Sequence, residues 1–197
     1  MKTKNILSSV VILAVFLFLS FFIFLLYRET ETKRLPVLGE VADFVLYDTN
    51  DREITLGKLR GKVWVADFIF TSCGDLCPLM TKNMAALHRA FLADDQVHLV
   101  SISVDPETDS PSALARYAKK YNADTRTWHF LTGPRETIQK LSVESFKIGS
   151  LEEPIFHSDR FVLVDAKARI RGYYEGRQPQ TRKTLLRDIG ILLKEKP

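Results

Sequence analysis

Residues 6–26 carry no charged side chain, and this run constrains the chain more than any other feature of the sequence. Eighteen of its 21 positions are apolar and the other three are serines. As a helix the run would be about 32 Å long, enough to cross the hydrocarbon core of a membrane. It is longer than the apolar region of a signal peptide and ends in Leu25-Leu26-Tyr27-Arg28 rather than in a small-x-small cleavage site. The sequence therefore predicts an uncleaved transmembrane anchor over residues 6–27.

The charges that flank the anchor do not by themselves fix its orientation. Lys2 and Lys4 precede it, and Arg28, Lys33 and Arg34 follow it. Long C-terminal domains cross a membrane largely regardless of charge, so we expect residues 1–5 to form a cytoplasmic tail and the domain to lie outside. No Arg-rich, Ser-rich presequence precedes the anchor, which favours a bacterial inner membrane with the domain on the periplasmic or extracellular side.

The net charge of the chain is concentrated near the anchor. Of the formal +4, residues 1–34 carry +3, from five Lys/Arg and two Asp/Glu, and the remaining 163 residues carry +1. A nearly neutral domain with mixed charges gives no reason to expect a nucleic-acid partner.

The rest of the chain alternates between strand and helix patterns. After a polar tether over residues 28–38, we expect one domain over residues 39–197. Strands are predicted at 62–70, 97–104 and 128–131, hairpins at 41–56 and 161–174, and helices from 79, at 110–121, 133–146 and 182–194. This alternation is typical of an α/β sheet with helices on both faces.

The only two cysteines, Cys73 and Cys77, lie in a Gly-containing loop between the strand at 62–70 and the following helix. If the loop winds into the helix, residues four apart share a face with Cβ atoms about 6 Å apart. Thiolates at a helix start suit Cu(I), and the same pair can form a disulfide or a redox couple. The loop between them is too short for an effective structural cross-link.

Two thiolates leave a copper ion short of ligands, and His157 is the strongest candidate for a third. It lies in an irregular stretch that no strand or helix pattern explains, and imidazole binds both oxidation states of copper. His88, His98 and His129 fall within helix and strand patterns and are interpreted as packing or surface residues, and Met80 as core.

Asp105 follows the strand at 97–104, at the sheet edge where α/β folds collect their sites. It is interpreted either as an acid that orients His157 or tunes the thiols, or as part of a turn, with Pro106, that ends the strand. The residues leave both interpretations open.

Four segments together resemble the Sco/SenC family over essentially the whole domain. They read Phe-Thr-Ser-Cys-Gly-Asp-Leu-Cys-Pro at 70–78, Val-Ser-Ile-Ser-Val-Asp-Pro-Glu-Thr-Asp-Ser-Pro at 100–111, Trp-His-Phe-Leu-Thr-Gly at 128–133, and His-Ser at 157–158.

The resemblance implies a thioredoxin-like fold, and the N-terminal transmembrane helix predicted above fits the family too. It also implies one copper, Cu(I) or Cu(II), on Cys73, Cys77 and His157, for delivery to, or thiol reduction at, the binuclear copper site of cytochrome c oxidase subunit II. Asp105 matches the acid of the family's Ser-Val-Asp-Pro motif. Family members often carry an acid directly before the histidine, whereas this chain has Phe156, which puts the tuning of the ligand in doubt rather than its binding.

Two functions follow from these expectations. The first is a copper chaperone whose partners are subunit II, other copper chaperones or thiol reductants, and the membrane. The second is a thiol-disulfide oxidoreductase or redox sensor that uses Cys73 and Cys77 without metal. Only the first requires His157, so removal of its imidazole separates them.

Overall fold

The computed structural model describes residues 13, 15–22, 34–74, 76–149 and 158–195. The chain divides into two units, Met1–Arg34 and Leu35–Pro197. Residues 15–22 of the first unit are helical. Among the described residues, no helix combines the length and the apolar character that a membrane crossing requires. The transmembrane anchor over residues 6–27 therefore stays a prediction.

The second unit is built on a six-stranded mixed sheet in the order β1-β8-β7-β4-β5-β6. The strands are β1 Gly39–Glu40, β4 Val63–Ile69, β5 Val97–Ser103, β6 Trp128–Leu131, β7 Arg160–Val164 and β8 Arg169–Glu175. The strands β4, β5 and β6 are parallel, while β4–β7, β7–β8 and β8–β1 are antiparallel. The central strand β4 is buried along its whole length, as its continuous apolar sequence predicts.

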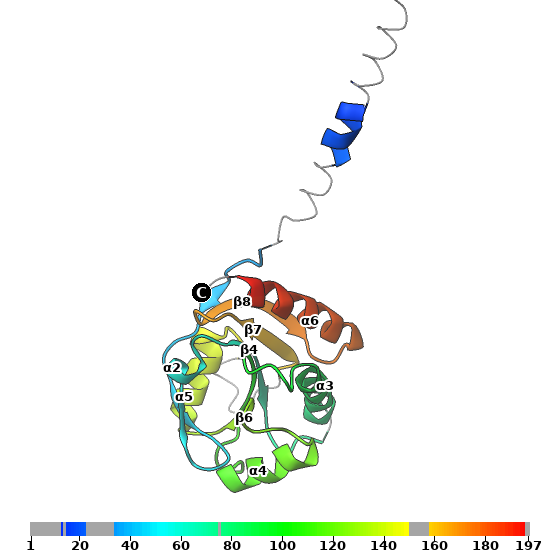
Figure 1. Cartoon of the computed structure of the whole chain (residues 1–197). Coiled ribbons are helices and arrows are strands. Elements are labelled where there is room, and N and C mark those ends of the chain that lie inside the picture. Colours follow the sequence, from blue (N-terminus) through cyan, green and yellow to red (C-terminus); the bar gives the residue numbers. More distant parts are fainter. Residues whose placement is uncertain (1–12, 14, 23–33, 75, 150–157, 196–197) are drawn as a thin grey trace, which may run out of the picture. The chain divides into compact units, whose positions relative to one another are not determined.

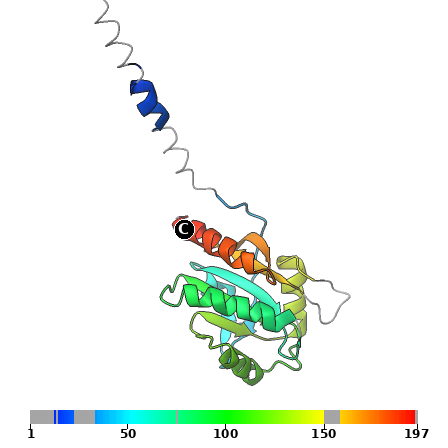
Figure 2. The same ribbon diagram turned by 90° about the vertical axis from the view of Figure 1, so that its right-hand side faces the viewer.

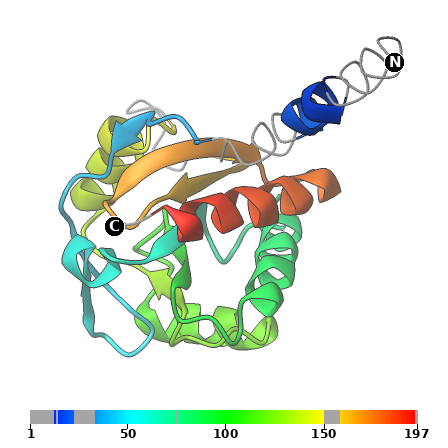
Figure 3. The same cartoon turned by 45° about the horizontal axis from the view of Figure 1, so that its top comes forward.

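Helices cover both faces of this sheet (Figure 1). They are α2 Leu56–Leu59, α3 Leu76–Ala90, α4 Pro111–Lys120, α5 Arg135–Lys140 and α6 Pro179–Lys194. Figure 2 looks onto the side on which α6 crosses the sheet, and Figure 3 shows α3 and α6 together on one side with α2 on the other. The predicted α/β architecture with helices on both faces is confirmed.

Two apolar cores lie on the two sides of the sheet. The core under α3, α4 and α6 contains Met80 and Trp128, and the core under α5 contains Trp64 and Phe146. The alternation of side chains along β4 divides Trp64 from Val65 in this way. Met80 is fully buried, which confirms its interpretation as a core residue.

The predicted hairpin at 41–56 is present as a separate two-stranded sheet of β2 Val45–Tyr47 and β3 Glu53–Thr55. The single helix expected at 133–146 is instead α5 followed by a turn of π-helix, η1 Leu141–Ser145. The wider turn is stabilised by tertiary contacts, because Ser145 Oγ accepts a hydrogen bond from Ala42 N at 2.8 Å and donates to Glu40 O at 3.4 Å.

The compact unit begins at Leu35, four residues before the predicted start of the domain. Arg171 on β8 is 3% exposed and donates to the carbonyl oxygens of Leu35 and Pro36 at 2.6 and 3.0 Å. The same guanidinium contacts carboxylate oxygens of Asp165 and Glu195 at 2.8 and 2.7 Å. We call Arg171, Asp165 and Glu195 the Arg171 cluster; it fixes residues 35–36 to the domain.

Candidate metal centre

The cysteine loop joins the carboxyl end of β4 to the start of α3. A turn closed by Cys73 N donating to Phe70 O at 3.2 Å ends the strand. The helix begins at Leu76, so Cys77 lies in its first turn while Cys73 precedes it. The two cysteines therefore do not share a helical face.

The structure still brings the two cysteines together. Cys77 N donates to Cys73 Sγ with a nitrogen-to-sulfur distance of 3.4 Å, and both residues are thiols. Amide groups in the first turn of a helix have no partner within it, and they stabilise negative charge on an acceptor. Cys73 is half-buried and Cys77 is 4% exposed. Cys73 is therefore the more accessible of the two cysteines.

Burial raises the pKa of the Cys77 thiol to about 12. Interactions with Cys73 and with the Asp67 carboxylate raise it further, while an interaction with the Phe70 backbone lowers it. At neutral pH Cys77 thus keeps its proton. A metal cation that binds this sulfur must displace the proton, and in return it gains a soft thiolate ligand of the kind that Cu(I) prefers.

Asp67 is a buried acid near the thiols that the sequence analysis did not single out. Its Oδ1 accepts from Ser101 Oγ at 2.6 Å, and that hydroxyl accepts from Trp128 Nε1 at 3.0 Å. Its Oδ2 has no hydrogen-bond partner among the described residues. Burial raises the pKa of Asp67 to about 7. A single acid within an otherwise apolar strand was the signal that could have drawn attention to it.

Asp105 lies at the same edge of the sheet as the cysteine loop, because Val104 N donates to Ile69 O at 2.9 Å. Its carboxylate lies 3.9 Å from the Arg135 guanidinium, and its carbonyl accepts from the N–H groups of Thr108 and Asp109. Asp105 therefore begins the turn that ends the strand, which agrees with one of its two interpretations. Its carboxylate also forms an ion pair at this edge of the sheet.

His157, the predicted third ligand, and Phe156 lie outside the described residues. The chain is described again from Ser158, and Asp159 O accepts from Gly176 N at 2.5 Å. Gly176 O in turn accepts from Asn83 Nδ2 of α3 at 2.6 Å. The residue two positions after His157 is thus connected to the helix that carries Cys77.

Within the part of the chain that the structure describes, no three His, Cys, Asp or Glu side chains are grouped so that they could hold a metal ion. The other histidines have contacts elsewhere. His88 Nε2 lies 3.0 Å from Thr127 Oγ1, and His98 Nδ1 lies 2.9 Å from His129 Nε2. The described part of the site is the sulfur pair, whose donors suit copper.

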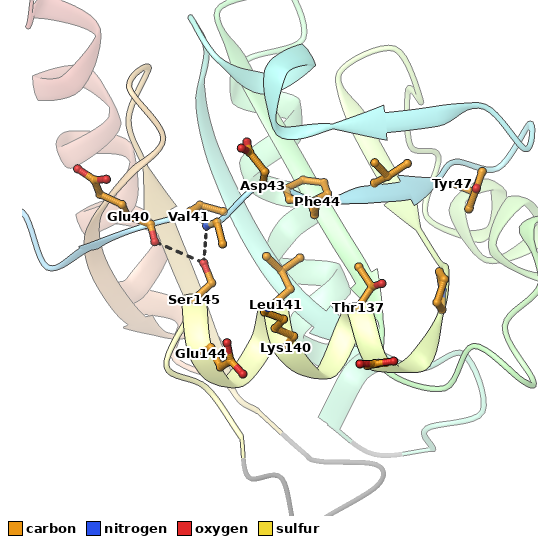
Figure 4. A pocket seen from close by; sticks show the side chains of 14 residues that line it. Glu40, Val41, Asp43, Phe44, Tyr47, Thr137, Lys140, Leu141, Glu144 and Ser145 are labelled. Carbon is orange, nitrogen blue, oxygen red and sulfur yellow. Dashed lines mark hydrogen bonds between the residues drawn. The ribbon is translucent and has the colours of Figure 1, made fainter.

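A groove of about 930 Å³ lies between residues 40–47 and the α5–η1 segment. Figure 4 shows Phe44 and Leu141 along it, with Asp43 and Glu144 beside them. Neither cysteine nor Asp105 lines this groove, so it is separate from the sulfur pair.

Comparison with known proteins decides the family. Residues 35–193 match the SCO1/SenC family. The chain belongs to the SCO1/SenC family. The predicted family resemblance is thereby confirmed.

Individual relatives agree with this assignment. The SCO1 protein homolog of Bacillus subtilis is 35% identical over 147 residues, which cover 72% of this chain and 76% of that protein. The structure of BsSco, a member of the Sco family of cytochrome c oxidase assembly proteins with a disulfide switch, has a TM-score of 0.72 at 31% identity. The match covers 83% of this chain and 100% of BsSco.

The copper-bound structure of ScoI from Bradyrhizobium japonicum has a TM-score of 0.65 at 24% identity, covering 78% of this chain and 99% of ScoI. At this identity the likeness shows the shared fold. These structural neighbours confirm the thioredoxin-like fold for the described residues of the second unit.

Proposed function

We propose that this SCO1/SenC protein is a membrane-anchored copper chaperone that binds one copper ion, Cu(I) or Cu(II). Its task would be to deliver the ion to the binuclear copper site of cytochrome c oxidase subunit II, or to reduce the thiols of that site. Family membership over residues 35–193 and the 31% identity with BsSco, a cytochrome c oxidase assembly protein, support this role.

The proposed ligands are Cys73, Cys77 and His157. The observation that carries the proposal is the hydrogen bond from Cys77 N to Cys73 Sγ, 3.4 Å long, at the start of α3. Bound copper would supply a soft cation that two thiolates and one imidazole can hold. The connection of Asp159 to α3 through Gly176 and Asn83 supports the participation of His157.

The unequal burial of the two sulfurs gives each a part in copper transfer. Cys73, the more exposed, would exchange first with a ligand from the partner, such as another copper chaperone or subunit II itself. Cys77, whose pKa is raised to about 12, would take up a proton as copper leaves, which opposes return of the ion. Asp105, paired with Arg135, is proposed as an acid that influences this exchange.

Titration with copper of the wild-type protein and of His157→Ala tests the ligand set. The variant should bind at least about 100-fold more weakly, since loss of even an outer contact to a metal ligand costs 10- to 100-fold. His98→Gln, which changes a histidine bonded to His129 rather than a proposed ligand, is the matched control and should bind as the wild type does. Equal copper affinity of His157→Ala and wild type would refute the three-ligand site.

A thiol-disulfide oxidoreductase or redox sensor is the second candidate, favoured by the adjacent thiols and by the disulfide switch of BsSco. The Cys73 thiolate would attack a partner disulfide and release one partner thiolate. Cys77 would then lose its proton and attack the Cys73 sulfur, which releases the second partner thiol. The partner gains two electrons, and this chain is left with a disulfide. His157→Ala should leave this exchange nearly unchanged.

We further propose residues 1–5 as a cytoplasmic tail, 6–27 as the single transmembrane helix of a bacterial inner membrane and 28–38 as a tether. Residues 39–197 would then be the copper-binding domain on the periplasmic or extracellular side. The uncharged run at 6–26 supports this arrangement. Retention of the full chain in membranes after alkaline carbonate extraction is the expected result.

A further inference from the structure

Asp109 closes the turn that begins at Asp105, and it is fully buried. Its carboxylate accepts hydrogen bonds from both donors of Thr71: the backbone N–H, at 3.0 Å from Oδ2, and the hydroxyl. Its Oδ2 also accepts from Ser103 Oγ at 2.6 Å. One carboxylate therefore joins the first residues of the cysteine loop to the end of β5.

None of the ion pairs among the described residues includes Asp109. A buried carboxylate is destabilising unless its oxygens accept hydrogen bonds. The hydroxyl and amide donors of Thr71 and Ser103 supply the stabilisation instead. Hydrogen bonds to an ionised acceptor are about twice as strong as those between neutral groups. Loss of the hydrogen bonds from Thr71 and Ser103 would leave the Asp109 carboxylate buried without donors. These bonds therefore fix the positions of Thr71 and Ser103.

Two short chains of contacts lead from Asp109 to the candidate site. Thr71 lies inside the turn that Cys73 N closes on Phe70 O, and Cys73 Sγ accepts from the first turn of α3. On the other side, Ser103 Oγ accepts from Asp105 N at 3.1 Å, and Asp109 N donates to Asp105 O at 2.9 Å.

We propose that Asp109 is a positioning residue that fixes the Cys73 sulfur relative to Cys77 and to Asp105. The inference rests on the proposed copper site for its functional meaning, while the thiol geometry it describes exists without metal. Asp109 acts through Thr71 and Ser103, and it touches neither sulfur in the hydrogen bonds described.

The test compares Asp109→Asn and Thr71→Val with Thr71→Ser, which keeps the hydroxyl. The first readout uses metal-free protein: the equilibrium of the Cys73–Cys77 disulfide with glutathione, which measures the effective concentration of one thiol at the other. The second is the absorption spectrum of the protein loaded with Cu(II), and the third is the thermal unfolding midpoint. Asp48→Asn is the matched control, because Asp48 is a buried acid that organises a turn of the β2–β3 hairpin.

We expect Asp109→Asn and Thr71→Val to lower the effective thiol concentration by about tenfold, since small displacements of reacting groups have large effects. Both should also shift the Cu(II) spectrum, and Thr71→Ser should restore wild-type values. Asp48→Asn should lower only the unfolding midpoint. Thr71→Val keeps the backbone hydrogen bond to Asp109 and removes only the hydroxyl. If Asp109→Asn does not fold, the thiol equilibrium and the Cu(II) spectrum of Thr71→Val test the positioning role.

Wild-type disulfide equilibria and spectra in Thr71→Val and in folded Asp109→Asn, with only the midpoint lowered, would reduce Asp109 to a stabilising residue and overturn the inference. Failure of the wild-type protein to bind copper would instead refute the proposed function. The metal-free disulfide equilibrium would still decide the role of Asp109 in that case.

Discussion

Buried charged side chains are stabilised in different ways in the Arg171 cluster and around the cysteine loop. In the cluster, a buried guanidinium pairs with the Asp165 and Glu195 carboxylates. Around the cysteine loop, Asp67 and Asp109 are fully buried and receive hydrogen bonds only from neutral donors among the described residues. A paired charge anchors chain segments to each other. Asp67 and Asp109 instead hold neighbouring hydroxyl and amide donors in position.

Removal of the guanidinium of Arg171 should have the largest effect on stability. Arg171→Met removes the buried guanidinium from Asp165, whose remaining ion pair is with Arg169, and from the half-buried Glu195. Loss of one member of a buried ion pair costs about 3–5 kcal/mol. The free energy of unfolding, measured by urea denaturation, should fall by that amount. Arg182→Met changes an exposed arginine on α6 and should alter it by less than about 0.5 kcal/mol.

An Arg171→Met variant as stable as the wild type would break the comparison, because the cluster would then not anchor residues 35–36. Arg171→Lys separates the effect of the charge from that of the guanidinium geometry, since an ammonium group cannot reproduce the forked contacts of the guanidinium. The lysine variant should have an intermediate stability.

Asp67→Asn should produce a smaller effect that depends on pH. The pKa of Asp67 is raised from 3.8 to about 7 in the folded protein, so between these values the folded state binds more protons than the unfolded state. The contribution of this group to stability therefore falls as pH rises from about 4 to about 7. Asp67→Asn removes this loss, and its stability relative to wild type should rise by about 3 kcal/mol across the window.

Urea denaturation of wild type and Asp67→Asn at pH 4, 5.5 and 7 measures this difference. Parallel pH profiles of the two proteins would mean that Asp67 is not a buried acid with a raised pKa. Asp67 would then not differ in its ionisation from the paired carboxylates of the Arg171 cluster.

His129 should give the smallest effect, with the opposite dependence on pH. Burial and the neighbouring His98 lower the pKa of His129 from 6.5 to about 4, so the unfolded state binds the extra proton first as pH falls. Its stabilising contribution is complete above pH 6.5 and is lost as pH falls toward 4. His129→Gln should reduce the acid-induced loss of stability by about 1–2 kcal/mol, as measured by unfolding at pH 7 and pH 4.5.

The opposite signs of these two pH dependences distinguish the groups from each other. A steeper loss of stability at low pH in His129→Gln than in wild type would contradict the assigned direction. Combining Asp67→Asn with His129→Gln should give additive effects, because the two side chains share no described hydrogen-bond partner.

Much of the fold followed from patterns along the chain. The apolar run at 62–70 predicted the buried strand β4, and the strand and helix signals after it matched β5, α4 and β6 within one or two residues. The helix at 133–146 was predicted only in part, because Ser145 takes its hydrogen bonds from residues some hundred positions away. Local periodicity contains no information about such contacts.

The candidate site was predicted less completely than the fold. Cys73 and Cys77 were singled out because cysteines between a strand and a helix are typical of functional thiols, and in the structure Cys77 N donates to Cys73 Sγ. Asp67 and Asp109 were missed because one was interpreted as part of an apolar strand and the other received no separate interpretation. The role of His157 as a ligand stays a prediction. Asp105 lies at the same sheet edge as the cysteine loop and forms an ion pair with Arg135.

The sequence by itself determined the family, the order of strands and helices, and the chemistry of the two sulfurs, since these depend on residue type and spacing. Only the tertiary structure decided that Cys77 is the more deeply buried thiol, that Asp109 joins the cysteine loop to β5, and that Arg171 fixes residues 35–36. The physical reason is that burial and charge pairing depend on groups brought together from distant parts of the chain.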